Sequence, residues 1–261
     1  MKKLFLIYHY FIYLLKSTNK HGVHSPFVFD LLTDVIDNKK EYYVYKEVEP
    51  LRRKLKLSSD TVDCIDLGAG SHKAGSSTRT VKQLINYSVK SAKYSQLLFR
   101  LVNHFQPSTI IELGTSLGIT AAYIAKANSK SKFITIEGCA DIADIARQNF
   151  VELNITNAKQ LVGNFDVLLP DVLSENDSVD FVFFDGNHRK AATLNYFEQC
   201  LTKANDTSVF VFDDIYWSAE MKEAWEEIKS NAKVTVTIDL FYMGIVFFRK
   251  EQIKEHFVLR F

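Results

Sequence analysis

The sequence predicts an α/β fold: a mostly parallel sheet with helices on both faces, an antiparallel C-terminal hairpin and an N-terminal helical extension. Short apolar runs, typical of buried strands, alternate with helical patterns from about residue 93 onward. Two strand-like runs near the C-terminus, KVTVTIDL and YMGIVFFRK, are separated by only a short turn at Phe241 and predict the hairpin. The first 90 residues show short helical patterns instead, which predicts the extension.

Composition limits the size of the fold and the kinds of partner. A chain of 261 residues with 47% hydrophobic content can bury one large core and a small additional module. The 32 basic and 31 acidic residues give a net charge of +1, so no overall field attracts nucleic acid or anionic lipid, and no nucleic-acid partner is expected. Cys64, Cys139 and Cys200 are too widely spaced for a CxxC site or a disulfide framework. We therefore expect a cytoplasmic protein.

The apolar run over residues 4–15 is interrupted by His9 and three tyrosines, and Lys16 follows it instead of a cleavage site. It is shorter than the roughly 20 residues needed to cross a bilayer, so no transmembrane segment is expected. We interpret it as an amphipathic helix docked on the protein body or on a partner subunit, with contact to a membrane surface as the alternative. One stripe of this helix would form a homodimer by packing against a second copy: Phe5, Tyr8, Phe11, Ile12 and Leu15.

The first part of the chain predicts helices at about residues 4–16, 26–37 and 41–56, followed by a glycine-rich loop. Its segment VDCIDLGAG resembles a strand that enters a glycine turn, but no alanine-rich helix comes after it. We therefore interpret residues 66–77 as a loop at the mouth of the site that acts as a lid. The chain is expected to divide into an extension over residues 1–90 and a ligand-binding domain over residues 91–261.

Helices and strands alternate regularly in the second part. Apolar residues recur at helical spacing over residues 93–105, where Pro107 ends the helix, and a buried strand is expected at 109–113. The following strands are FITIE, KQLVG, DFVFFD and SVFVFDD. A helix is expected after each of them: one that begins at Asp141, one over about residues 167–173, one that begins at Arg189 and one that begins at Ala219. The carboxyl ends of parallel strands meet at one edge of the sheet, where ligands bind in this class of fold.

A glycine turn follows the strand at 109–113, in the sequence IIELGTSLG. Its spacing is E-x-G-x-x-x-G, and Ser116 stands where a dinucleotide-binding motif has its middle glycine. An acid at the strand end repels a nucleotide phosphate but suits S-adenosylmethionine, which carries a sulfonium and an ammonium group. The next strand ends in FITIEG, where Glu137 can accept hydrogen bonds from both ribose hydroxyls. As an alternative, Glu112 only stabilises the N-terminus of the following helix.

Four motifs in order, IIELGTSLG, FITIEG, FVFFDGNH and VFVFDD, resemble those of the Rossmann-like class I S-adenosylmethionine-dependent methyltransferases. The resemblance extends to the small-molecule O-methyltransferases related to catechol O-methyltransferase and to the macrocin-type sugar methyltransferases, and it covers about residues 93–250. It implies a small-molecule acceptor, O-methylation and a cofactor site whose residues are Glu112, Gly114, Thr115, Ser116, Gly118, Glu137, Gly138, Gly163, Asn164 and Asp185.

Carboxylates at the ends of two later strands predict a metal site. Asp185, Asp213 and Asp214 would lie on neighbouring carboxyl ends, and gathered oxygen ligands suit Mg²⁺. The catechol enzyme has an asparagine where this chain has Asp214, so the resemblance keeps an oxygen donor but adds a negative charge. His188 takes the position of that family's catalytic lysine, three residues after Asp185, and is the expected general base. A purely structural role for His188 is the alternative.

Other interpretations stay open. Methylation of RNA or protein, with the basic run at residues 52–56 as a docking surface, is one alternative, and an inactive cofactor-binding protein is another. A nicotinamide dehydrogenase is disfavoured by the missing middle glycine. Tyr216 and Trp217 would line an acceptor pocket or simply pack at a helix start. His21 and His24 have no acidic partner at metal-ligand spacing and are expected to have capping or core roles.

Overall fold

The computed structural model describes residues 2–64 and 77–261 and forms two compact units. One unit contains residues 39–171, and the other combines residues 1–38 with residues 172–261. The N-terminal segment therefore packs with the C-terminal part of the chain. Most of the predicted loop at residues 66–77 lies outside the described residues. The division into an extension over residues 1–90 and a cofactor-binding domain over residues 91–261 stays a prediction.

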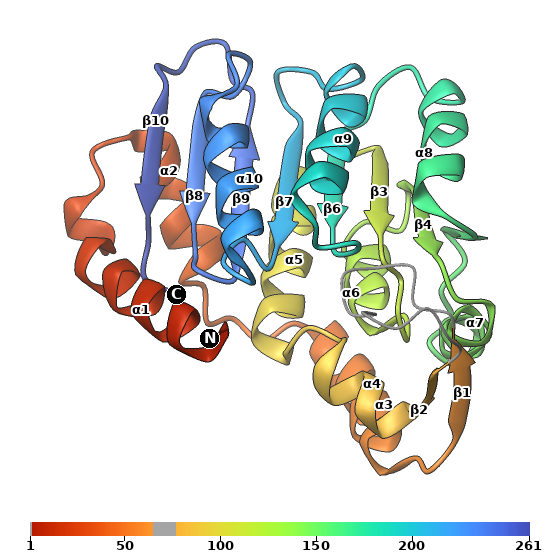
Figure 1. Cartoon of the computed structure of the whole chain (residues 1–261). Coiled ribbons are helices and arrows are strands. Elements are labelled where there is room, and N and C mark those ends of the chain that lie inside the picture. The colour runs from red at the N-terminus through yellow and green to blue at the C-terminus, as the bar shows by residue number, and fades with distance from the viewer. Residues whose placement is uncertain (1, 65–76) are drawn as a thin grey trace. The chain divides into compact units, whose positions relative to one another are not determined.

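In the unit of residues 39–171, three parallel strands follow one another in the order β3-β4-β5. The first two of them are labelled in Figure 1. Their bounds are Thr109–Leu113, Lys132–Glu137 and Ala158–Val162. The helices of this unit are α3 (Tyr43–Leu57), α4 (Val81–Tyr87), α5 (Ala92–Phe105), α6 (Ile119–Ala127) and α7 (Ala140–Glu152). The segments β1 (Thr61–Cys64) and β2 (Ser77–Thr80) form a separate antiparallel pair.

The ends of these helices follow local sequence signals. Thr80 and Gln83 form a reciprocal capping box at the start of α4. Gln106 adopts a left-handed conformation with φ 47° after α5, directly before Pro107, which stops the helix there as predicted. Every residue of α6 except Lys126 is buried, so this alanine-rich helix packs on several sides instead of presenting a polar face.

In the other unit, the strand order is β10-β8-β9-β7-β6. The bounds are β6 Phe181–Phe184, β7 Val209–Asp213, β8 Val236–Asp239, β9 Met243–Phe247 and β10 Glu255–Val258. Strands β6 and β7 are parallel, whereas β9 runs antiparallel to both β7 and β8. The predicted antiparallel hairpin is therefore confirmed, and β10 adds a further parallel strand beside β8.

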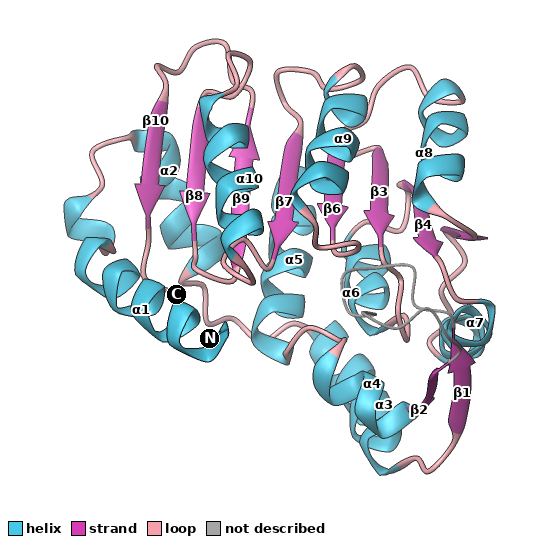
Figure 2. Ribbon diagram, viewed as in Figure 1, coloured by secondary structure: helices cyan, strands magenta, loops and turns pink. Residues whose placement is uncertain are grey.

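Helices cover both faces of these strands (Figure 2). The bounds of these helices are α1 Lys2–Lys16, α2 Pro26–Leu31, α9 Lys190–Leu201 and α10 Ala219–Ser230. A 3₁₀ turn covers Lys20–Gly22, and a π-helical turn covers Leu32–Ile36. Helix α8 (Phe165–Ser174) spans residue 171, where the first unit ends and the second continues. Trp225 of α10 packs so closely on β9 that a Cβ at Gly244 would lie 2.6 Å from its ring. Phe27 of α2 contacts Phe247 of the same strand. Gly244 and Phe247 are three residues apart and so face opposite sides of the sheet, which places α10 and α2 on opposite faces.

The C-terminal residues hold α1 against the body of this unit. Thr18 forms a parallel bridge with Leu259, and the buried Tyr13 hydroxyl donates a hydrogen bond of 2.5 Å to the Leu259 carbonyl oxygen. The backbone N–H of Phe261 donates to the same hydroxyl at 3.2 Å. Burial raises the pKa of Tyr13 to about 12, so this hydroxyl keeps its proton for the bond at ordinary pH.

Candidate active site

The glycine turn between β3 and α6 has the strained backbone that its sequence implies. Gly114 and Gly118 have φ values of 110° and 76°, and Ser116 also lies in the left-handed region at 48°. The N–H of Gly118 donates to the Thr115 carbonyl at 2.9 Å, which closes the turn. A Cβ on Gly118 would approach the ring of Phe150, on α7, to 2.8 Å. Gly118 is therefore required both by its backbone conformation and by the closeness of α7.

Glu137, the last residue of β4, is fixed by two backbone groups. One carboxylate oxygen accepts a hydrogen bond from the N–H of Ser116 at 2.8 Å, and the other accepts from the N–H of Cys139 at 3.0 Å. The first bond joins the end of β4 to the glycine turn, and the second holds the loop of Gly138. A carboxylate offers about four acceptor positions, so Glu137 can accept further hydrogen bonds from a ligand.

Glu112 lies beneath the same turn and is completely buried. One of its oxygens accepts a hydrogen bond of 2.6 Å from the hydroxyl of Thr135, which lies 2.6 Å from the hydroxyl of Thr115. The other oxygen, Oε1, has no hydrogen-bond partner among the described residues. Burial raises the pKa of Glu112 to about 8; the hydrogen bond from Thr135 opposes this rise and the charge of Glu137 adds to it.

The loop after β5 is joined to the same region. The N–H of Gly163, at φ 151°, donates to the Glu137 carbonyl oxygen at 2.9 Å. The Asn164 side chain accepts from the N–H of Asp166 at 2.9 Å and so starts α8. The loop after β3 reaches β4 in the same way, because the N–H of Gly114 donates to the carbonyl oxygen of Ile136 at 2.9 Å. The predicted residues of this unit thus gather where β3, β4 and β5 end.

A second cluster lies at the ends of β6 and β7. Potential ligand atoms of Asp185, His188 and Asp213 all lie within 4.8 Å of one another. His188 Nε2 is 3.8 Å from a carboxylate oxygen of Asp185 and 3.9 Å from one of Asp214. The backbone N–H of Asp214, which has φ 53°, donates to the Tyr242 carbonyl oxygen at 2.7 Å. The sequence predicted Asp185, Asp213 and Asp214 as ligands. The structure groups Asp185 and Asp213 with His188, whereas Asp214 is outside this group of three and approaches only His188.

The two aromatic residues after Asp214 differ in their surroundings. Tyr216 stacks on Phe241 with ring centroids 5.0 Å apart, and its hydroxyl donates to Asp239 at 2.8 Å. Burial raises the pKa of Tyr216, so it remains a donor. Trp217 is 48% exposed. Tyr216 therefore has a packing role, and only Trp217 presents its ring to solvent beside the cluster.

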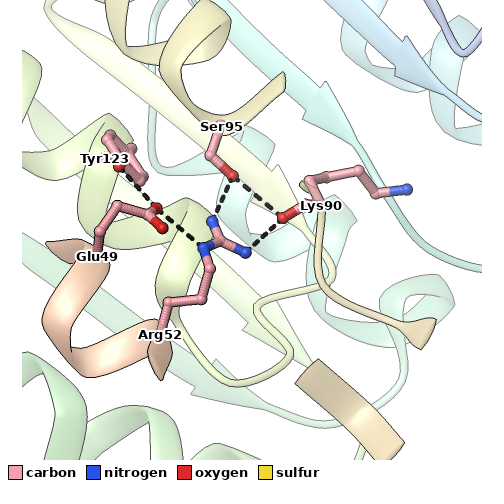
Figure 3. Close-up of polar contacts among 5 residues, drawn as sticks. All are labelled: Glu49, Arg52, Lys90, Ser95 and Tyr123. Carbon is pink, nitrogen blue, oxygen red and sulfur yellow. Dashed lines mark hydrogen bonds and ion pairs between the residues drawn. The ribbon is translucent and has the colours of Figure 1, made fainter. Parts of the chain in front are cut away.

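The basic run at residues 52–56 is partly structural, which the sequence did not reveal (Figure 3). Arg52 is only 4% exposed; it donates hydrogen bonds to Glu49 at 2.9 Å, to the Lys90 carbonyl oxygen at 2.6 Å and to Ser95 at 3.2 Å. The Tyr123 hydroxyl donates to the same Glu49 oxygen at 3.0 Å. This network joins α3 to α5 and to α6, and it removes Arg52 from any docking surface. The spacing of Glu49 and Arg52 by three residues signals their ion pair but not the burial of Arg52.

Comparison with known proteins supports the class that the fold and the glycine turn indicate. Residues 111–215 match a family model described as a methyltransferase domain. No curated protein matches the chain. Among solved structures, a putative O-methyltransferase from Klebsiella pneumoniae has a TM-score of 0.57 and 16% identity, covering 81% of this chain and 92% of its own. The O-methyltransferase TomG from Streptomyces achromogenes has a TM-score of 0.56 and 18% identity, with coverages of 85% and 95%.

The fungal methyltransferase PaMTH1 from Podospora anserina is similar over more of its length, with a TM-score of 0.60, 11% identity and coverages of 87% and 98%. At these identities the likeness is one of fold. The predicted α/β class is confirmed: the chain has the Rossmann-like fold of class I methyltransferases. It carries a methyltransferase domain over residues 111–215. Among the described residues, no helix is long and apolar enough to cross a membrane.

Proposed function

We propose that this protein is an S-adenosylmethionine-dependent methyltransferase that methylates an oxygen of a small-molecule acceptor. The observation that carries the proposal is the pair of carboxylates at the glycine turn, with Glu137 fixed by two backbone N–H groups and Glu112 buried beneath them. The structure of TomG is a complex with S-adenosylmethionine and that of PaMTH1 is bound to S-adenosylhomocysteine. The free, buried Cys139 and Cys200 are consistent with a reducing cytoplasm.

The residues at the ends of β3 to β5 fit the cofactor. Glu137 is oriented to accept hydrogen bonds from ribose hydroxyls, and Gly163 and Asn164 would border the adenine. The unpaired oxygen of the buried Glu112 would accept from a cationic group, and a positive charge there would favour the ionised carboxylate. Gly114, Thr115, Ser116 and Gly118 let the backbone approach the cofactor closely. When bound, S-adenosylmethionine supplies the methyl group, and Asp185 is expected to contribute to its binding.

The cluster at the ends of β6 and β7 fits a divalent cation. Its donors are carboxylate oxygens and one imidazole nitrogen, and Asp213 is 1% exposed. Mg²⁺ and Mn²⁺ prefer oxygen donors, which leaves the imidazole of His188 available as a base. Asp185, Asp213 and Asp214 would hold the ion, which when bound would stabilise the ionised form of an acceptor hydroxyl. The family resemblance implies Mg²⁺.

His188 is the residue that would take the proton from the acceptor hydroxyl. Its Nε2 has carboxylate oxygens of Asp185 and Asp214 at 3.8 and 3.9 Å, which would stabilise the imidazolium formed on proton uptake. Asp185 would also orient the ring. The remaining task of the protein is to place the acceptor oxygen in line with the methyl group, since the displacement itself needs mainly correct geometry.

The test is calorimetric titration of the full chain with S-adenosylmethionine and S-adenosylhomocysteine, with and without Mg²⁺ or Mn²⁺. We expect binding in the micromolar range, reduced about 100-fold or more in Glu137→Ala. Glu152→Ala is the matched control, because Glu152 is a half-exposed carboxylate paired with Lys54. A folded wild-type protein that binds neither compound would exclude the proposed function. Retained affinity in Glu137→Ala would exclude the proposed site.

A further inference from the structure

Helix α1 exposes an apolar stripe. Leu4, Ile7, Tyr8, Phe11 and Leu15 recur at steps of three and four residues, and they are between 53% and 86% exposed. Such spacing places them along one side of the helix. A continuous row of large exposed apolar side chains is uncommon on a soluble surface and marks an interaction site.

The opposite side of α1 already packs against the protein. Tyr13 is buried and bonded to Leu259, and Tyr10 contacts the ring of Phe241 at 4.9 Å between centroids. His9 lies over Tyr216 at 5.7 Å. The helix is thus apolar on two sides and is held in place by one of them. The exposed stripe is therefore a fixed feature of the folded chain, and a second surface must cover it for its apolar area to leave water.

Charge indicates what that surface is. The first 29 residues contain Lys2, Lys3, Lys16 and Lys20 but no aspartate or glutamate, although the whole chain has a net charge of only +1. A second copy of α1 would offer no complementary charge, because this helix has lysines but no acid. An anionic lipid surface instead complements the lysines and takes up the leucine, isoleucine and aromatic side chains.

We propose that α1 lies in the plane of an anionic lipid surface, with its stripe of Leu4, Ile7, Tyr8, Phe11 and Leu15 inserted at the headgroup boundary and with Lys16 and Lys20, at and just beyond its C-terminal end, bound to the anionic headgroups. At 15 residues it is too short to span a bilayer and suits an in-plane position. The contact of His9 with Tyr216 places this helix beside the loop that follows Asp213 and Asp214. That loop lies on the side of α1 opposite the stripe, so insertion of the stripe would leave the loop and the candidate metal site on the protein side of the helix.

The test is flotation of the full chain with vesicles of phosphatidylcholine alone or of phosphatidylcholine mixed with phosphatidylglycerol. The wild type should float with the anionic vesicles only, and binding should weaken with added salt. The double variant Ile7→Ser/Phe11→Ser should bind at least about tenfold more weakly, since it loses two inserted side chains. Lys16→Gln and Lys20→Gln should each weaken binding about fivefold.

The matched control is Leu57→Ser/Ile253→Ser, which removes two side chains that are 85% and 76% exposed but lie outside α1. This control should float like the wild type. The proposal is overturned if the wild type ignores anionic vesicles, or if the α1 and control variants bind equally. It is also overturned if the wild type is a dimer in sedimentation velocity that does not bind vesicles, and if Ile7→Ser/Phe11→Ser converts this dimer to a monomer. Cofactor binding is measured separately, so failure of either proposal leaves the other intact.

Discussion

The two candidate sites of this protein are built on different physical principles. At the glycine turn, Glu137 is bound by backbone N–H groups at 2.8 and 3.0 Å, and the adjoining helix α6 is held by the buried Arg52 network. At the ends of β6 and β7, His188 lies 3.8 and 3.9 Å from two carboxylates, beyond direct hydrogen-bond distance. The first site is fixed by backbone hydrogen bonds to its carboxylate, whereas the second brings an imidazole and carboxylates close together.

This difference separates recognition from reactivity. A backbone-bound carboxylate has a fixed direction, which suits selective binding of a cofactor that every catalytic cycle uses in the same way. Acids close to an imidazole form a site whose protonation and geometry can respond to a metal or a substrate proton. Mutations in the first region should therefore affect stability and cofactor affinity together, and mutations in the second should affect metal binding with little loss of stability.

The largest stability effect is expected from Arg52→Met. It leaves Glu49 without its buried cation and removes the donors to Ser95 and to the Lys90 carbonyl, at a cost of about 3–5 kcal/mol of unfolding free energy. Lys54→Met, on the same helix, breaks only the exposed pair with Glu152 and should cost at most about 1 kcal/mol. Urea unfolding of both variants measures the contrast. Equal effects would show that the network does not stabilise the fold.

The sharpest functional contrast is between Glu137→Ala and Asp213→Ala. The first should lower affinity for S-adenosylhomocysteine about 100-fold, or about 2.7 kcal/mol, and leave Mn²⁺ binding unchanged. The second should abolish Mn²⁺ binding measured by calorimetry, because Asp213 lies among the three clustered ligand atoms. His188→Ala should leave Mn²⁺ binding nearly unchanged, because the aspartates are proposed to hold the ion and His188 to act as the base. If Glu137→Ala and Asp213→Ala each lost both S-adenosylhomocysteine and Mn²⁺ binding, the two sites would not be separable.

Much of the fold was predictable because burial leaves a clear pattern. The apolar runs at residues 109–113 and 181–184 became β3 and β6, and the helix expected over 93–105 is α5, Ala92–Phe105. Strand β10 was missed, since its residues EHFV are only partly buried and lack a continuous apolar run. Helix α4 was also missed, although its capping box was visible in the sequence.

The sites were predictable only in part. Strand ends and glycine turns point to Glu112, Glu137 and Asp185 because their positions depend on local sequence. The burial of Arg52 was not predictable, since it depends on Lys90 and Ser95, which are 38 and 43 residues away, and a basic run ordinarily indicates a solvated helix face. The approach of His188 to Asp213 depends similarly on the parallel pairing of β6 with β7.

A smaller effect is expected from Gly118→Ala. A residue with a Cβ is strained at φ 76°, and that Cβ would lie 2.8 Å from the Phe150 ring, so a loss of about 1–3 kcal/mol in unfolding free energy is expected. Truncation of the ring in Phe150→Ala should relieve part of this clash. The double variant should therefore be less destabilised than the sum of the two single variants, as measured by chemical denaturation. Additive losses would show that only the backbone strain matters.

The last prediction tests the buried acid itself through the pH dependence that Glu112 contributes to stability. Its pKa is raised from 4.5 to about 8, so between these pH values the native state holds a proton that the unfolded state has released. Glu112 therefore contributes its full stabilisation below about pH 4.5, and this contribution is lost progressively as the pH rises toward about 8. Glu112→Gln keeps the shape but cannot ionise, so its unfolding free energy should fall less steeply over that range. The control Glu152→Gln, at an exposed position, should retain the wild-type slope; an unchanged slope in Glu112→Gln would show that Glu112 is already ionised in the folded protein.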